Sequence, residues 1–329
     1  MLHSSPEYAM FRMLALSCSD DQRRATAFWG EWMRRIALCM ALLLSFLCSP
    51  SLAAKSQPQF VLTFDDLPSH GPWPVGETPE TVSNRLLAAL KAAHIRHAYG
   101  FINGASAARD PALAQILKDW TAAGYELRNH GWSHQALDTL DAARFRDELL
   151  RNEAFIPAGA PKVFRFPYLD TARDTALRDA ARTILAEQGY AVAPDDFGAP
   201  DWAYNQAWVR CRAAGDTPAL ARLEAAFLAQ LKDSAARARA AAKTHYGRDI
   251  PYVLLLHSSA FTAHMLPQAL EMLRAEGFTN TSLSEALADP ANAASADPRL
   301  PFASASLFTR TGERDAEPPF ALDNNCPAR

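Results

Sequence analysis

Short apolar segments alternate with longer stretches of helical spacing through most of this chain. The apolar segments, which we expect to be strands, are residues 60–64, 97–102, 125–128, 162–165, 190–193 and 252–256. The intervening stretches, which we expect to be helices, are residues 79–93, 111–123, 141–155, 171–188, 218–243, 266–276 and 283–288. Alternation of this kind predicts a mainly parallel sheet, either open or closed into a barrel.

Polar side chains stand where several of the predicted strands end. Asp65 and Asp66 follow the first strand, Arg165 ends the fourth and His257 follows the last. In a β/α barrel, the catalytic residues occupy this end of several different strands. We therefore predict a single α/β domain, a distorted (β/α) barrel, over residues 55–300. The remaining residues, 301–329, are predicted to form an irregular tail.

The first 53 residues have the three parts of a secretory signal. Arg34 and Arg35 precede the apolar run 36–48, and small residues follow at 51–54. This run is too short to span a bilayer comfortably, so no stable membrane span is expected after cleavage. Residues 1–53 are predicted to be a signal peptide and leader, with Met33 a candidate for the true start. The mature protein is then exported, to the periplasm or outside the cell.

Removal of the leader leaves two cysteines, Cys211 and Cys326. An oxidising compartment favours a disulfide between them, which would tie the tail to the body of the domain. The alternative is two unrelated thiols, since the sequence does not give their distance. The formal net charge of -3 gives no electrostatic reason to expect a nucleic acid as a partner.

Two carboxylates and two histidines stand out as candidates for a metal centre. Asp65 and Asp66 can both turn toward one site where the strand gives way to a loop, and His130 and His134 can share one helical face. Taken singly, such residues are more often loop starts, helix caps or partly buried histidines. Together, Asp66, His130 and His134 supply the three-ligand set of an open zinc site. Asp65 is then the candidate base.

Four short motifs in a fixed order make the chain similar to a known family. They are Thr-Phe-Asp-Asp at 63–66, His-Gly-Trp-Ser-His at 130–134, Arg-Phe-Pro-Tyr at 165–168 and Leu-Leu-His at 255–257. This order resembles the polysaccharide deacetylases, the NodB-homology domain of carbohydrate esterase family 4. The resemblance covers roughly residues 58–290, and it implies the distorted (β/α) barrel of this family and an acetylated glycan as substrate.

The resemblance implies a role for each motif residue. Asp66, His130 and His134 would hold a divalent metal, usually Zn²⁺ in this family. Asp65 would be the general base that takes a proton from the attacking water. Arg165 would orient Asp65 through a charge-assisted contact.

Further roles are implied on the substrate side of the site. The backbone N–H of Tyr168 would help to stabilise the oxyanion, and His257 would be the general acid that protonates the leaving amine. An unperturbed imidazole pKa of about 6.5 suits this second role. Leu255 and Trp202 would flank the acetyl methyl group.

The chain departs from the family pattern at three places, and two of them lie in the motifs; the third is the long predicted helix 218–243, which looks like an insertion. Leu67 stands where a glycine is common, and the nearby His70 is expected to be a loop or groove residue rather than a fourth ligand. Gly198 stands where the family has an aspartate that pairs with the acid histidine, in an Asp-x-x-Asp-Trp motif. Asp195 and Asp196 are the candidate replacements, and we predict that Asp196 tunes His257.

These observations predict a metal-dependent hydrolase that removes N-acetyl groups from a polysaccharide or cell-wall glycan. The alternatives are a related O-acetyl esterase or cyclic-imide hydrolase, and a non-catalytic glycan-binding module on the same scaffold. The sequence leaves the glycan open among peptidoglycan, chitin oligomers, poly-N-acetylglucosamine and acetylated xylan.

Overall fold

The computed structural model describes residues 57–301, 303–322 and 326. The predicted signal peptide, with Met33, lies outside these residues. None of the described helices has the length and apolar character that a bilayer crossing requires.

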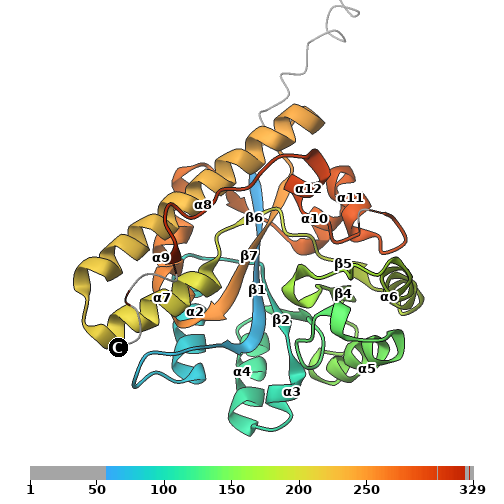
Figure 1. Cartoon of the computed structure of the whole chain (residues 1–329), viewed down its shortest axis with the longest axis horizontal. Coiled ribbons are helices and arrows are strands. Elements are labelled where there is room, and N and C mark those ends of the chain that lie inside the picture. The colour runs from blue at the N-terminus through green and yellow to red at the C-terminus, as the bar shows by residue number, and fades with distance from the viewer. Residues whose placement is uncertain (1–56, 302, 323–325, 327–329) are drawn as a thin grey trace, which may run out of the picture. The chain divides into compact units, whose positions relative to one another are not determined.

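The centre of the domain is a parallel sheet that curls without closing (Figure 1). Along the sheet, the strands follow the order β5-β4-β3-β2-β1-β7-β6, and β8 pairs with the start of β1. Their bounds are β1 Gln59–His70, β2 Ala98–Ile102, β3 Glu126–Asn129, β4 Val163–Phe164, β5 Ala191–Val192, β6 Phe197–Gly198, β7 Pro251–Ser259 and β8 Thr279–Asn280. The predicted fold class, a distorted (β/α) barrel in a single domain, is confirmed.

Helices surround the sheet, and all of those described except α3 and α7 begin at a residue whose side chain caps the helix. They are α2 Pro79–Ala92, α3 Gly104–Ala107, α4 Pro111–Ala122, α5 Ala142–Asn152, α6 Thr175–Glu187, α7 Asp201–Ala214, α8 Thr217–Tyr246, α9 Ala260–Ala275, α10 Leu283–Ala288, α11 Pro290–Ala296 and α12 Leu307–Thr311. At α2, Thr78 forms the expected N-cap and Pro79 occupies the first turn. Helix α7 was not among the helices predicted from the sequence.

Strand β1 is buried on both faces. Phe60, Leu62 and Phe64 belong to the large core cluster, whereas Val61 packs with Val253 of β7 on the other face. Burial on both faces is typical of a parallel sheet that carries helices on each side. Because β2 and β7 flank β1 over most of its length, the C-terminal end of β1 is held in a fixed position.

The C-terminal segment, expected to be irregular, contains α12 and packs on the domain. Leu307, Phe308 and Leu322 are buried in the main core. Cys326 forms a disulfide with Cys211 of α7, so the predicted tie between tail and body is present.

The disulfide is expected to stabilise the fold, since it closes a loop across a sequence separation of 115 residues. A Cys211→Ser/Cys326→Ser variant should lose about 2–5 kcal/mol of the free energy of unfolding. Urea denaturation of the oxidised wild type, the reduced wild type and the variant measures this difference. The reduced wild type should match the variant, and equal stability of all three would contradict the expectation.

Candidate active site

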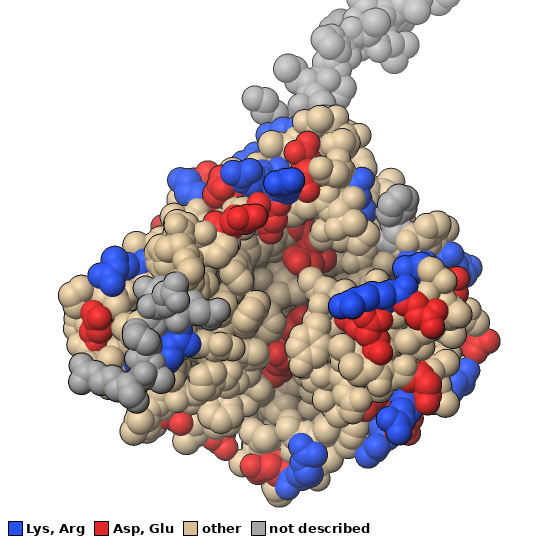
Figure 2. Space-filling view, in the orientation of Figure 1, with Lys and Arg blue, Asp and Glu red and all other residues tan. Residues whose placement is uncertain are grey.

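A cavity of about 600 Å³ opens at the C-terminal ends of the central strands. Figure 2 shows it as a hollow in this face of the molecule, with acidic side chains inside it. Its lining lacks Arg165 and Asp196 but includes the other eight of the ten predicted site residues: Asp65, Asp66, His130, His134, Tyr168, Trp202, Leu255 and His257. His70 lines it as well. Segments far apart in the chain therefore meet at one site, as the strand-end placement predicted.

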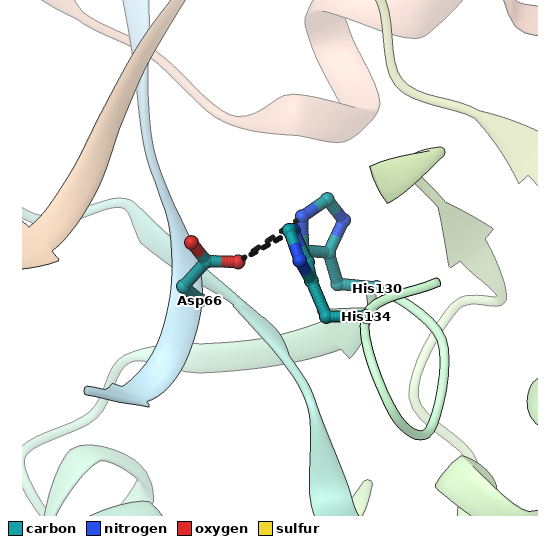
Figure 3. Close-up of side chains that lie close together, drawn as sticks. All are labelled: Asp66, His130 and His134. Carbon is teal, nitrogen blue, oxygen red and sulfur yellow. Dashed lines mark ion pairs between the residues drawn. The ribbon is translucent and has the colours of Figure 1, made fainter. Parts of the chain in front are cut away.

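Three side chains gather at one side of this cavity (Figure 3). Asp66 comes from β1, and His130 and His134 come from the loop after β3. Their potential ligand atoms all lie within 4.8 Å of one another. The Asp66 Oδ1 atom is 3.0 Å from His134 Nε2 and 3.5 Å from His130 Nε2. Three donors from two separate segments thus converge on one point.

The two histidines are not on a helix, so the predicted shared helical face is wrong. Gly131 has a φ of 76° and His134 has a φ of 55°, both in the left-handed region. The Asn103 side chain donates hydrogen bonds to the carbonyl oxygens of His130 and Gly131. These contacts fold residues 130–134 into a loop, which brings the two imidazole rings to a centroid distance of 5.1 Å.

The chemistry of this cluster fits a zinc-type ion. Asp66 Oδ1 is buried and has no hydrogen-bond partner among the described residues. His130 Nδ1 donates to the carbonyl of Arg165 at 2.9 Å, which leaves Nε2 free as a ligand. Burial raises the pKa of the Asp66 carboxyl, but the adjacent imidazoles of His130, His134 and His70 lower it well below its usual range. One carboxylate and two imidazoles are the donors of an open zinc site.

Asp65 lies beside the cluster and is held by a buried arginine, as the sequence predicted. The Arg165 side chain is fully buried, and its Nη1 donates to Asp65 Oδ1 at 2.7 Å. The same guanidinium donates to the hydroxyl of Thr63 and to the carbonyl of Pro194. The other carboxylate oxygen of Asp65, Oδ2, is 3.6 Å from His130 Nε2. The carboxylate therefore has one oxygen fixed and the other facing the cluster.

The partner of His257 is Asp201, so the prediction of Asp196 is wrong. Asp201 Oδ1 accepts from His257 Nδ1 at 2.8 Å, and Asp201 Oδ2 accepts from the His257 backbone N–H at 2.7 Å. Asp196 is engaged elsewhere: its carboxylate accepts from the backbone N–H of Val253 and from the guanidinium of Arg310. The sequence displayed Asp201 beside Trp202, but only α7, which begins at Asp201, brings it to His257.

Gly198 has a local reason to be a glycine. It lies on β6 opposite Leu255 of β7, and a Cβ atom at this position would be 2.9 Å from the Leu255 carbonyl oxygen. A side chain at position 198 would therefore require the strands to shift. This close approach explains why no aspartate stands there.

Asp201 strongly affects the charge state of His257. Burial lowers the pKa of the His257 imidazole. The negative charge of Asp201 and its hydrogen bond raise it by more than burial lowers it, so that the pKa is about 9. The imidazole is consequently protonated at neutral pH and faces the same cavity as Asp65 and Asp66. Such a group is able to donate a proton.

The remaining candidates also line the cavity. The ring of Tyr168 is 4.4 Å from that of His134, and the Tyr168 backbone has a φ of 57°. Trp202 and Leu255 also face the cavity. The sequence did not indicate Asp315 and Ala316 of the C-terminal segment, which line the same cavity.

A curled parallel sheet with this cluster, a carboxylate on one side and a protonated imidazole on the other is suited to metal-assisted hydrolysis. Residues 53–192 match the family model described as polysaccharide deacetylase. The match confirms the resemblance seen in the motifs to the polysaccharide deacetylase family. No curated protein sequence matches the chain.

Solved structures with a similar fold include a family 4 carbohydrate esterase from Streptomyces lividans in complex with acetate. It is 23% identical, with 68% of this chain and 91% of that chain covered and a TM-score of 0.44. The peptidoglycan deacetylase PdaC from Bacillus subtilis is 20% identical, with coverages of 70% and 89% and a TM-score of 0.43. A CE4 family pseudoenzyme from Bacillus anthracis is 18% identical, with coverages of 70% and 66% and a TM-score of 0.47.

The contact between His257 and Asp201 predicts a raised pKa for the His257 imidazole, which can be measured. In the metal-free protein, the His257 imidazole should titrate near pH 9 in an NMR experiment. An Asp201→Asn variant should titrate at lower pH, because burial then acts without the opposing negative charge. An Asp196→Asn variant should leave the pKa of His257 unchanged. A shift in the Asp196 variant but not in the Asp201 variant would contradict the assignment.

Proposed function

We propose that the protein is a metal-dependent hydrolase that removes N-acetyl groups from an N-acetylated polysaccharide or cell-wall glycan. The observation that carries this proposal is the presence of three kinds of group in one cavity. These are the Asp66, His130 and His134 cluster, the buried carboxylate Asp65 and the protonated imidazole His257. The polysaccharide deacetylase match over residues 53–192 supports it.

Asp66, His130 and His134 would hold the metal, for which Zn²⁺ is the candidate. When bound, a zinc ion polarises the amide carbonyl and lowers the pKa of water to about 7. Asp65 then accepts the proton of the water that attacks the carbonyl carbon. Arg165 donates a hydrogen bond to Oδ1 of Asp65, which leaves Oδ2 facing this water.

His257 supplies the second proton transfer. An amine is a poor leaving group until its nitrogen is protonated, so cleavage of the carbon–nitrogen bond needs an acid. His257 gives its proton to this nitrogen as the bond breaks, and the products are acetate and a glycan amine. Asp201 holds the imidazole in orientation through Nδ1, so that Nε2 is the atom that donates.

Three residues are proposed to position the acetyl group. The backbone N–H of Tyr168 would donate to the carbonyl oxygen as negative charge develops there. Leu255 and Trp202 would enclose the methyl group, since both face the same cavity as His257. The side chain of Trp202 is 46% exposed, which leaves its ring available to a sugar as well.

We also propose that the protein is exported, to the periplasm or the cell exterior. The disulfide between Cys211 and Cys326 supports this, because disulfides persist in oxidising compartments. The charged, apolar and small-residue segments before residue 55 have the order of a signal peptide.

Substitution of the acid tests the proposed reaction. A His257→Ala variant should release acetate from N-acetylglucosamine oligomers about 10²–10⁴-fold more slowly than wild type, because general acid catalysis is lost. The assay measures acetate with zinc present, and His264→Ala, on α9 outside the cavity, is the matched control.

Several outcomes would separate the alternatives. Acetate release from acetylated xylan, but not from N-acetylated oligomers, would identify an O-acetyl esterase. Glycan binding by a zinc-loaded wild type that releases no acetate would contradict catalysis and indicate a binding module.

A further inference from the structure

A second cavity of about 530 Å³ lies directly beside the active-site cavity. Leu169 and Asp195 line both, so the two cavities are contiguous. The second cavity lies between α6 and the C-terminal segment. Its lining residues are Leu169, Thr171, Arg178, Arg182, Asp195, Pro301, Ala303, Ser304, Ala305, Ser306 and Thr309.

Two arginines of α6 bring positive charge to this cavity. Arg178 and Arg182 are four residues apart, so their like charges lie on one face of the helix. Arg182 donates to the carbonyl of Pro301 and lies 3.7 Å from Asp179. By contrast, the guanidinium of Arg178 has no acceptor in the described part of the chain, and its Nε is buried without a partner. Arg178 therefore has donors available for a ligand.

Ser304 adds a second unpaired donor to the same lining. The residue is 8% exposed, and its hydroxyl is buried without a hydrogen-bond partner among the described residues. The Ser304 backbone has a φ of 66°, in the left-handed region that serine rarely adopts. A buried hydroxyl without a partner costs free energy unless a ligand or water satisfies it.

One carboxyl lines the cavity beside these donors. Burial raises the pKa of Asp195, and the positive charge of Arg165 lowers it. The nearby carboxylates of Asp315, Asp196 and Asp65 raise it as well, and the resulting pKa is about 7. Asp195 is therefore only partly ionised at neutral pH, and it does not balance the two guanidinium charges.

We propose that Arg178, Arg182 and Ser304 form an anion subsite. It binds a carboxylate carried by the glycan whose acetylated unit occupies the adjacent active-site cavity. The proposal rests on the proposed function and extends it, since it names an acidic N-acetylated glycan as the substrate class. Arginine is suited to this role because its planar fork of donors matches a carboxylate.

Binding of two glycans of equal length tests the subsite. One is a neutral N-acetylglucosamine oligomer, and the other alternates N-acetylglucosamine with N-acetylmuramic acid, which carries a carboxylate. Calorimetry with zinc-loaded His257→Ala protein measures both affinities without turnover. We expect the acidic glycan to bind roughly 10- to 100-fold more tightly, as a charge-assisted hydrogen bond would give. The KM values of the wild type provide the same comparison if the His257 variant does not fold.

Arg178→Gln should remove this preference and leave the affinity for the neutral glycan unchanged. Arg173→Gln is the matched control, because Arg173 is 95% exposed and lies outside the cavity. Equal affinity for the two glycans, or a preference that Arg178→Gln does not alter, would overturn the proposal. A third result would also overturn it: inorganic phosphate or acetate binds in a way that depends on Arg178, while the protein shows no preference between the two glycans. The site would then bind a free anion rather than a glycan carboxylate.

Failure of the proposed function would look different. A wild-type protein that releases no acetate from either glycan would contradict the hydrolase, whereas the binding preference reports on the subsite alone.

A separate observation concerns His70, at the end of β1. Its Nδ1 lies 2.6 Å from Asp66 Oδ2, and because a carboxylate only accepts, Nδ1 is the donor. This bond occupies Oδ2 and leaves Oδ1 facing His130 and His134. Asp66 has a φ of 62°, in the left-handed region, which turns its side chain out of the regular strand geometry.

The geometry assigns His70 as a positioning residue that turns Oδ1 of Asp66 toward the ion. Zinc affinity, measured by competition with a chelator, should fall roughly 10- to 100-fold in His70→Ala, as is usual for residues that orient a ligand. His70→Asn keeps a donor close to the position of Nδ1 and should recover most of the affinity. Ser69→Ala is the control.

Unchanged affinity in His70→Ala, or an equal loss in His70→Asn, would overturn this role. A wild-type protein that binds no zinc would instead contradict the metal site itself, on which this inference rests.

Discussion

The buried ion pair between Arg165 and Asp65 is the contact on which the geometry of the site depends. A fully buried guanidinium is costly unless its charge is paired. Arg165 pairs its charge with Asp65, and its two Nη atoms donate to Asp65, to Thr63 and to the carbonyl of Pro194. Its Nε has no partner among the described residues, and its guanidinium carbon lies 4.3 Å from the centre of the Phe101 ring. The ends of β1, β4 and β5 are thereby joined at one point. Loss of Arg165 would leave a buried carboxylate unpaired beside the metal ligands.

The register of the central strands places the proposed base and the proposed acid next to each other. Asp65 of β1 pairs with His257 of β7 in the parallel ladder, so the two residues are direct neighbours on adjacent strands. Asp66, one residue later, leaves the strand geometry with a positive φ and turns toward the histidines. The sheet alone thus brings together the proposed base, the proposed acid and one of the three proposed metal ligands. The loop after β3 contributes the other two proposed ligands.

The sheet and most of the site could be predicted from the sequence, because strand-end polar residues and capping signals are local features. The parts that were missed depend on tertiary contacts. The loop 130–134 was expected to be helical, but hydrogen bonds from Asn103, distant in the chain, fix its shape. Asp196 was chosen as the partner of His257 because the sequence could not show that Arg310 of the C-terminal segment already occupies it. That segment was expected to be irregular, yet Asp315 and Ala316 form part of the cavity wall.

Zinc anomalous scattering from crystals of the zinc-loaded protein tests the central claim most directly. The account predicts one strong peak about 2.0–2.2 Å from Asp66 Oδ1, His130 Nε2 and His134 Nε2, with no peak there in crystals of His134→Ala. A peak bound to other residues, or none in wild-type crystals grown with zinc, would contradict the metal centre and the hydrolase built on it.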